Sequence, residues 1–332
     1  MARIRDLDLG DFPLLLAPME DVSDPPFRFL CKANGCDMLY TEFISVEGLI
    51  RDAEKSMQKL DIYDSERPIG IQIFGAELEP MLQATDIVLE AQPEVLDINY
   101  GCPVKKVVCK DAGAGILRDI PKMIRLTKAV VERSPIPVTV KTRLGWDDQS
   151  KHIVEVAERL QDVGIAALSI HARTRSQMYK GEADWTLVGE VKNNPRMKIP
   201  IFGNGDIDSP QKAKAYKDQY GVDGIMIGRA SIGNPWIFNE IKHFLATGEL
   251  LDPPSVADRV NAARQHLKHS ITWKGEKLGV VEMRRHYANY FKSLEGIKHF
   301  RAVLVTEMNP DVIQEVLDQI EDQYSPQLME AI

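Results

Sequence analysis

Short apolar runs alternate with amphipathic stretches from Leu14 to Gly228, and this alternation restricts the chain to few folds. Eight runs indicate strands, at 14–17, 38–43, 69–74, 95–100, 138–144, 167–172, 199–203 and 224–228. Stretches between them indicate helices, at 80–91, 120–132, 152–163 and 210–220. Alternating strands and helices form βαβ units, and strands that are apolar almost throughout are typical of parallel sheets buried on both faces. Eight such units predict an α/β fold, a (β/α)8 TIM barrel rather than an open sheet.

The strand pattern stops after Trp236. Residues 247–254 are rich in glycine and proline and indicate a linker, and Ser255 is a candidate N-cap for the helix that follows. Four helical segments come next, at 256–273, 277–294, 297–308 and 310–324. We therefore expect two domains, a barrel over residues 1–245 and a small C-terminal helical bundle over residues 255–332.

The net charge of −8 argues weakly against a nucleic-acid partner, but the charges are unevenly distributed. Residues 259–301 contain ten Lys or Arg against three Asp or Glu, a formal +7. Residues 302–332 contain seven Asp or Glu and no Lys or Arg, a formal −7. The basic stretch is compatible with a site for a polyanion, and equally with helix faces of opposite charge that pair with each other.

Four cysteines are too few, and too irregularly spaced, to form a disulfide framework or a zinc site. The charged N-terminus lacks the apolar core of a signal peptide, and no apolar run approaches the ~18 residues of a membrane helix. We expect a cytoplasmic protein with no membrane segment, no bound metal and no obligate protein partner.

The C-terminal ends of the predicted strands, where TIM barrels carry their active sites, are unusually polar. The residues at these ends include Pro18, Met19, Glu20, Gln72, Asn99, Cys102, Lys141, Arg143, His171, Arg173, Asn204, Gly205, Asp206, Gly228 and Arg229. Buried polar groups need partners, so this density favours a polar ligand. A thiol at position 102, just beyond a strand, is placed for chemistry, although free cysteine is also a common core residue.

Two glycine-containing segments follow the last two strands, Gly203-Asn204-Gly205-Asp206 and Gly228-Arg229-Ala230. Glycine allows close approach of the backbone, arginine supplies charge-assisted hydrogen bonds, and loops at these positions of a barrel frequently bind phosphate. These segments predict a phosphorylated cofactor or substrate. Lys141 points from the fifth strand toward the barrel centre, where it suits the electron-rich end of a flavin, a Schiff base or a structural ion pair.

Ordered motifs make the chain resemble the flavin-dependent tRNA-dihydrouridine synthases, most closely the bacterial B-type subgroup. The resemblance runs from Leu14 to about Pro254, and the helical tail is less distinctive. The motifs are Leu16-Ala17-Pro18-Met19, Gln72-Ile73-Phe74-Gly75, Asp97-Ile98-Asn99-Tyr100-Gly101-Cys102-Pro103, Lys141-Thr142-Arg143-Leu144-Gly145, His171-Ala172-Arg173-Thr174, Asn204-Gly205-Asp206-Ile207 and Gly228-Arg229-Ala230. One position departs from the family pattern, because Glu20 stands where many relatives carry a small residue.

The resemblance implies an FMN-dependent oxidoreductase that uses NADPH or NADH and converts specific uridines of tRNA to dihydrouridine. The FMN phosphate would bind Asn204, Gly205, Asp206, Gly228 and Arg229. The flavin ring would contact Pro18, Met19, Gln72 and Lys141, with Glu20 and His171 close by. Reduced FMN would pass a hydride from N5 to C6 of the uracil ring.

The same resemblance assigns the remaining roles. Cys102 would give a proton to C5 of the uracil, and it must therefore remain a thiol at working pH. Asn99, with Arg143 or Arg173, would hold the base, which the enzyme must first flip out of the folded RNA.

In this interpretation residues 1–245 form the FMN-binding catalytic domain and residues 255–332 the tRNA-binding domain. Basic side chains are needed along the RNA backbone, and the candidates are Arg284, Arg285, Lys292, Lys298 and Arg301. Three alternatives stay open: a flavin barrel that reduces a free pyrimidine or enone, a flavin-free lyase or isomerase with Lys141 as Schiff base, and an RNA-binding protein without activity.

Overall fold

The computed structural model describes residues 1–325, and the predicted (β/α)8 barrel is confirmed within them. Nine parallel strands form its sheet: β3 (Leu14–Leu16), β4 (Leu39–Tyr40), β5 (Ile44–Ser45), β6 (Ile69–Phe74), β7 (Val95–Tyr100), β8 (Val138–Arg143), β9 (Ala167–His171), β10 (Ile201–Asn204) and β11 (Gly224–Ile227). Their order is β3-β11-β10-β9-β8-β7-β6-β4, with β5 beside β6. A parallel bridge between Leu15 and Met38 joins the two ends of this order and closes the barrel.

The second predicted strand, 38–43, is divided into β4 and β5. The cause is Thr41, whose hydroxyl accepts a hydrogen bond from the backbone N–H of Gln72 at 3.2 Å and donates one to the carbonyl of Glu42 at 2.9 Å. A side chain therefore replaces one rung of the backbone ladder. Because the strand is interrupted here, Glu42 and Phe43 lie at the mouth of the barrel instead of continuing the sheet.

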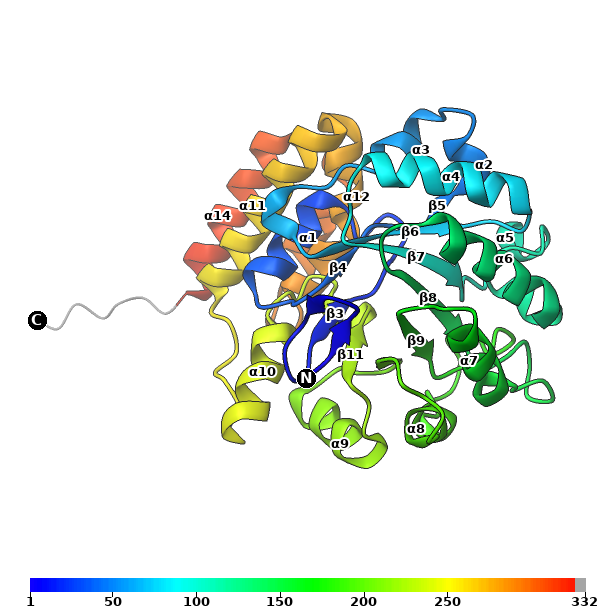
Figure 1. Cartoon of the computed structure of the whole chain (residues 1–332). Coiled ribbons are helices and arrows are strands. Elements are labelled where there is room, and N and C mark those ends of the chain that lie inside the picture. The colour runs from blue at the N-terminus through cyan, green and yellow to red at the C-terminus, as the bar shows by residue number, and fades with distance from the viewer. Residues whose placement is uncertain (326–332) are drawn as a thin grey trace, which may run out of the picture.

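Helices surround the sheet (Figure 1). Their bounds are α1 (Pro25–Ala33), α2 (Val46–Leu49), α3 (Glu54–Gln58), α4 (Leu78–Glu90), α5 (Lys105–Val108), α6 (Ile120–Arg133), α7 (Ile153–Asp162), α8 (Thr186–Asn193), α9 (Pro210–Tyr220) and α10 (Ile237–Thr247). The sequence patterns predicted α4, α6, α7 and α9 and did not identify α1, α8 and α10 or the short helices α2, α3 and α5. Two prolines open α1 without breaking it, because proline is tolerated in the first helical turn.

A two-stranded hairpin, β1 (Arg3–Ile4) and β2 (Leu7–Asp8), precedes the barrel and was not predicted. Its apolar residues Ala2, Ile4 and Leu9 are buried against inward-facing side chains of the barrel, such as Leu15 and Met38. The hairpin therefore seals the N-terminal end of the barrel, opposite the strand ends that carry the polar residues.

Four helices follow the barrel, close to the predicted positions: α11 (Val256–Lys274), α12 (Glu276–Tyr290), α13 (Lys298–Leu304) and α14 (Pro310–Tyr324). The predicted N-cap is confirmed, since Ser255 and Asp258 form a reciprocal capping box. These helices have a buried core of their own around Leu267, Tyr287 and Leu317. Residues 326–332 of the predicted helical domain lie outside the described part of the chain.

Part of the basic stretch pairs with the acidic stretch. Arg264 of α11 forms ion pairs with Asp318 and with Glu321 of α14, the latter at 2.7 Å. This contact matches the prediction of paired helix faces for one arginine and leaves other basic residues of the stretch free for a ligand. No helix described in residues 1–325 is both long and apolar enough to cross a membrane.

The C-terminal helices dock on α1, and Figure 1 shows α11 and α12 beside it. Phe27 of α1 stacks on His266 of α11 with ring centroids 5.6 Å apart. Lys274, the last residue of α11, lies between two carboxylates, Asp24 at the N-cap of α1 and Glu282 of α12. The side chains of Lys274 and Asp24 are 7% and 5% exposed, so this ion pair is buried in the contact between the barrel and the helices.

Replacing Lys274 with methionine keeps most of the unbranched side chain and leaves two carboxylates without their cation. Removing one partner of a buried ion pair strands the other, and we expect the free energy of unfolding to fall by about 3 kcal/mol. Urea denaturation measures this change. The matched control is Lys277→Met, three residues further on and exposed, which should shift stability by no more than about 0.5 kcal/mol. Equal effects of the two substitutions on the free energy of unfolding would show that the buried ion pair of Lys274 does not stabilise the fold.

Candidate active site

Cys102 lies in the turn that follows β7, at the C-terminal mouth of the barrel, and is only 5% exposed. The side chain packs with Ala76, Val107 and Ala112. The backbone of the residue is held at both ends, since its N–H donates to Asn99 Oδ1 at 2.8 Å and its carbonyl accepts from the N–H of Ala114 at 3.0 Å. Burial raises the pKa of the Cys102 thiol, so the group is protonated at neutral pH.

Gly113 makes this close packing possible. Its φ of +53° lies in the left-handed region, and a Cβ there would lie 2.9 Å from the carbonyl oxygen of Cys102. Any other residue would therefore push the Cys102 turn away from the segment that covers it.

Asn99 and Gln72 lie together beneath the Cys102 turn. Asn99 Oδ1 accepts hydrogen bonds from the N–H groups of Gly101 and Cys102, and Asn99 Nδ2 donates to Gln72 Oε1 at 2.7 Å. Gln72 Nε2 in turn donates to Asp97 at 2.5 Å. Both amide side chains are thus committed to the protein, each retaining one amide hydrogen for a ligand.

Lys141 comes from β8, beside Asn99 in the register of the sheet. Its Nζ donates to Asn204 Oδ1 at 3.3 Å, and Asn204 Nδ2 donates to the carbonyl of Met226 at 2.7 Å. Burial, with a contribution from the charge of Arg143, lowers the pKa of Lys141 to about 8. A cation this poorly compensated favours an electron-rich or anionic group next to it.

Arg143 ties the Cys102 turn to the loop after β9. Nε donates to the carbonyl of Gly101 at 2.7 Å, and Nη1 donates to the carbonyls of Thr174 and Met178 at 3.0 and 2.9 Å. Burial lowers its pKa to about 10. Within the described residues Nη2 has no protein partner, so it is the guanidinium nitrogen left for a ligand.

Arg173 and Arg229 share one carboxylate, that of Asp206. Arg173 binds it through both terminal nitrogens, at 2.9 and 2.5 Å, and Arg229 binds it at 2.9 Å. Burial would raise the pKa of Asp206, but these arginines and the N–H of Ala183 keep it below its usual value. The buried Arg173 is fully bonded to the protein, whereas Arg229 is largely exposed and can contact a ligand.

His171 lies next to this group, with Nε2 3.4 Å from Arg173 Nη1. Burial, together with four neighbouring cations, holds its pKa well below the ordinary value, so the imidazole is neutral at physiological pH. Gly205, with a φ of +125°, brings its backbone against this ring, and a Cβ there would lie 3.2 Å from His171 Cδ2.

The segment after β3 supplies the opposite side of the mouth. Pro18 is buried, Met19 is half-buried and Glu20 is exposed. A Cβ at Gly228 would meet only Ala17 and Met19, at the ordinary contact distances of 3.5 and 3.6 Å, so there is room beside this glycine.

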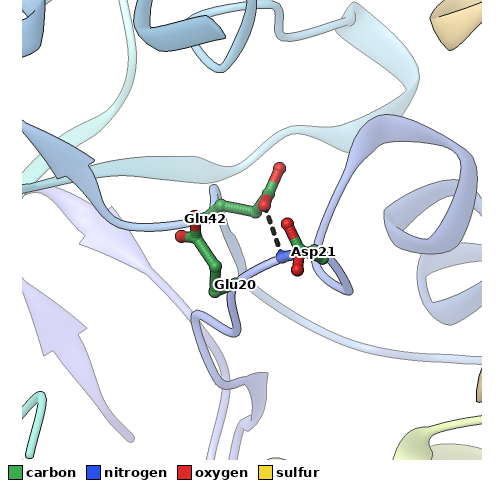
Figure 2. Close-up of side chains that lie close together, drawn as sticks. All are labelled: Glu20, Asp21 and Glu42. Carbon is green, nitrogen blue, oxygen red and sulfur yellow. Dashed lines mark hydrogen bonds between the residues drawn. The ribbon is translucent and has the colours of Figure 1, made fainter. Parts of the chain in front are cut away.

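Glu20 belongs to a group of three carboxylates that could hold a cation, together with Asp21 and Glu42 (Figure 2). Figure 2 shows the hydrogen bond that the N–H of Asp21 donates to Glu42, 2.6 Å long. Lys59 already supplies a positive charge here, 2.8 Å from Glu20 and 3.4 Å from Glu42. The unusual glutamate at position 20 is therefore explained by an ion pair with Lys59.

The predicted tRNA-contacting residues fall into two groups. Arg284 donates to the carbonyls of Thr306 and Glu307, and Arg285 donates to the carbonyl of Asp21 at 2.6 Å, so both arginines hold protein segments together. The other three are exposed: Lys292, Lys298 and Arg301.

Sequence reasoning missed Tyr179, which is 52% exposed in the loop after β9. The guanidinium carbons of Arg143 and Arg229 lie 5.6 and 5.1 Å from its ring centroid, and the His171 ring lies 6.2 Å away. The sequence signal that could have identified it is an aromatic residue a few positions after the His-Ala-Arg-Thr motif. The buried carboxylate of Asp97 was also missed as a site residue.

The thiol at Cys102 should react slowly with iodoacetamide near pH 7, because only the thiolate is nucleophilic and its pKa is raised. The exposed Cys109 provides the internal comparison and should be alkylated at least ~10-fold faster. Mass spectrometry of the two peptides measures both rates. The rate at Cys102 should still be rising above about pH 8.5; a plateau below that pH would show an activated thiolate instead.

Comparison with known proteins agrees with this geometry. Residues 15–325 match the family model described as Dihydrouridine synthase (Dus). The chain is 40% identical to tRNA-dihydrouridine synthase B of Pseudomonas putida over 289 residues, which is 87% of this chain and 85% of that protein. It is also 40% identical to the protein of the same name from Xanthomonas axonopodis pv. citri over 298 residues, 90% of this chain and 89% of that one.

A solved structure of histamine dehydrogenase from Rhizobium sp. 4-9 is similar in fold, with a TM-score of 0.54 at 12% identity, covering 79% of this chain and 50% of that chain. At this identity the likeness shows the fold alone. The family model covers nearly the whole described chain, and the two synthases match most of it at 40% identity. This chain therefore belongs to the dihydrouridine synthase family.

Proposed function

We propose that the protein is an FMN-dependent tRNA-dihydrouridine synthase, which uses NADPH or NADH to reduce the C5=C6 bond of specific uridines in tRNA. The observation that carries the proposal is the buried, protonated thiol of Cys102 at the barrel mouth, next to the lysine-bearing strand β8. Membership of the dihydrouridine synthase family supports it. Since the substrate is tRNA, we expect the enzyme to work in the cytoplasm.

The charges at the mouth of the barrel suit FMN, which carries a phosphate. Four cations lie around the mouth: Lys141, Arg143, Arg173 and Arg229. The carboxylate of Asp206 lies between Arg173 and Arg229. An anionic ligand would complete this balance. The backbone around Gly205 and Gly228, with the exposed Arg229, would hold the phosphate, and Asn204 and Asp206 would orient these groups.

The ring would be held by Pro18, Met19 and Gln72, with Lys141 at its electron-rich end. Once reduced by NADPH or NADH, bound FMN would supply the hydride that C6 of the uracil receives. Lys141, with a pKa of about 8, carries the positive charge that favours the reduced cofactor. His171 stays neutral, and Glu20 is held by Lys59, so neither adds a competing charge to the site.

Cys102 is the general acid of the proposed reaction. The thiol S–H bond breaks, and the proton goes to C5 of the uracil as hydride reaches C6. Asn99 and Nη2 of Arg143 retain hydrogen-bond donors that can hold the base. Arg173, bonded fully to Asp206 and to backbone carbonyls, acts on the base indirectly by shaping the mouth.

The Cys102→Ala variant tests whether Cys102 is the general acid. We expect it to retain FMN and to oxidise NADPH at close to the wild-type rate, while dihydrouridine formation falls by roughly 10²-fold or more, the usual contribution of a general acid. The assay incubates enzyme, NADPH and tRNA lacking dihydrouridine, and then maps the modified positions. Full activity in this variant would exclude Cys102 as proton donor, and a colourless protein without FMN would exclude the flavin mechanism.

The C-terminal helical region, α11 to α14 with their connections, supplies the proposed tRNA surface. Its three exposed cations are Lys292, Lys298 and Arg301. Replacing all three with glutamine should weaken tRNA binding and reduce the slope of log affinity against log salt by about 3, one for each lost phosphate contact. Lys128→Gln with Lys214→Gln, on the outer helices α6 and α9, is the control that should leave the slope nearly unchanged. Fluorescence anisotropy at several salt concentrations measures it. Equal slopes in the two variants would contradict the placement.

A further inference from the structure

A buried chain of hydrogen bonds leads from the barrel interior to the Cys102 turn. Thr139 Oγ1 donates to Asp97 Oδ1 at 2.6 Å, and Gln72 Nε2 donates to Asp97 Oδ2 at 2.5 Å. Asn99 Nδ2 donates to Gln72 Oε1 at 2.7 Å, and Asn99 Oδ1 accepts from the N–H groups of Gly101 and Cys102 at 2.9 and 2.8 Å. We call Thr139, Asp97, Gln72 and Asn99 the relay. Its members come from three adjacent strands, β6, β7 and β8.

The chemistry of the two ends fixes the direction of every bond between them. An ionised carboxylate only accepts, so Gln72 must turn its NH2 group toward Asp97 and its oxygen toward Asn99. Backbone N–H groups only donate, so Asn99 must turn its oxygen toward Cys102 and its NH2 group toward Gln72. The two requirements agree, and a single orientation of both amides satisfies every group.

We propose that Asp97 is a positioning residue for the proton donor: through Gln72 it holds Asn99 in the one amide orientation that can bind the backbone N–H of Cys102. The inference rests on the proposed function only in giving Cys102 the role of acid. The relay itself can be measured without catalysis.

The environment of Asp97 is consistent with this role. All four relay side chains are buried, with Asp97 1% and Gln72 0% exposed, so water does not compete for these bonds. The titratable groups that face Asp97 are Tyr40 from β4 and Lys141 from β8. Burial raises the pKa of Asp97 to about 6, so at neutral pH the carboxylate is ionised and can only accept. Below that pH a protonated Asp97 could donate to Gln72, and the direction of the relay would no longer be unique.

The direction of the hydrogen bonds in the relay can be reversed by exchanging the residue types at positions 97 and 99. In the Asn99→Asp variant, one carboxylate lies at each side of Gln72, and a single NH2 group cannot serve both. Adding Asp97→Asn removes the conflict, because the amide introduced at position 97 can accept from Thr139 and donate to Gln72. Gln72 then turns its own NH2 group toward the carboxylate introduced at position 99. That carboxylate still accepts from the N–H of Cys102.

We expect Asn99→Asp to lower the midpoint of thermal unfolding by roughly 5 °C or more and to raise the alkylation rate of Cys102 by about 10-fold. The carboxylate at position 99 can still accept from the N–H of Cys102, but Gln72 can donate to only one of the two carboxylates, so the Cys102 turn is no longer held to β6 through Gln72. The double variant Asp97→Asn/Asn99→Asp should recover at least half of both losses. Differential scanning fluorimetry and mass spectrometry of the Cys102 peptide provide these readouts. If Asn99→Asp alone does not fold but the double variant does, this outcome also counts as rescue.

The matched control is Thr139→Val with Asn99→Asp. Valine at position 139 removes the hydrogen bond from Thr139 to Asp97 but leaves the negative charge of Asp97 in place. The double variant Thr139→Val/Asn99→Asp should therefore show no rescue. Additive effects of Asp97→Asn and Asn99→Asp, or equal rescue by Thr139→Val, would overturn the proposal. A wild-type protein that forms no dihydrouridine would count against the proposed function instead, since neither the unfolding midpoint nor the alkylation rate depends on turnover.

Discussion

Closure of the parallel barrel is the constraint on which the rest of this structure depends. When β3 pairs with β11 and Leu15 bridges to Met38, the carboxyl ends of strands from Leu16 to Ile227 meet around one opening. Cys102, Lys141 and Asp206 come from separate segments of the chain and lie at this mouth for that reason alone. The N-terminal hairpin packs apolar side chains against the opposite end, so the polar residues lie at the other end of the barrel.

Burial then imposes a second condition, because each polar group at the mouth needs a partner. The arginines meet it differently. Arg173 is bonded entirely to Asp206 and to loop carbonyls, Arg143 keeps one nitrogen free, and Arg229 is exposed. In the proposed function these three arginines would have three different tasks: Arg173 would shape the mouth, Arg143 would contact the base and Arg229 would contact the phosphate. The docked helices add the exposed cations Lys292, Lys298 and Arg301, and the buried ion pair of Lys274 with Asp24 joins α11 to the barrel.

The sequence predicted much of this because the relevant signals are local. Period and composition identified eight strands and the four C-terminal helices, and Ser255 was recognisable as a cap from its position before an amphipathic run. The misses have separate physical causes. The second strand breaks because the Thr41 hydroxyl takes the place of a backbone partner, and α1 begins with prolines that resemble a helix breaker. Glu20 looked anomalous beside a flavin site until Lys59, far along the sequence, was found to pair with it.

The sequence by itself determined the fold class, the order of the elements and which residue types stand at the strand ends, because these follow from hydrophobic period and from motifs of neighbouring residues. Only the tertiary structure decided which of those residues bond to each other. Asp97, Gln72 and Thr139 lie on different strands, and their connection to the Cys102 turn depends on the register of β6, β7 and β8. Hydrogen bonds act over about 3 Å, and only the closed sheet brings these distant segments within that range.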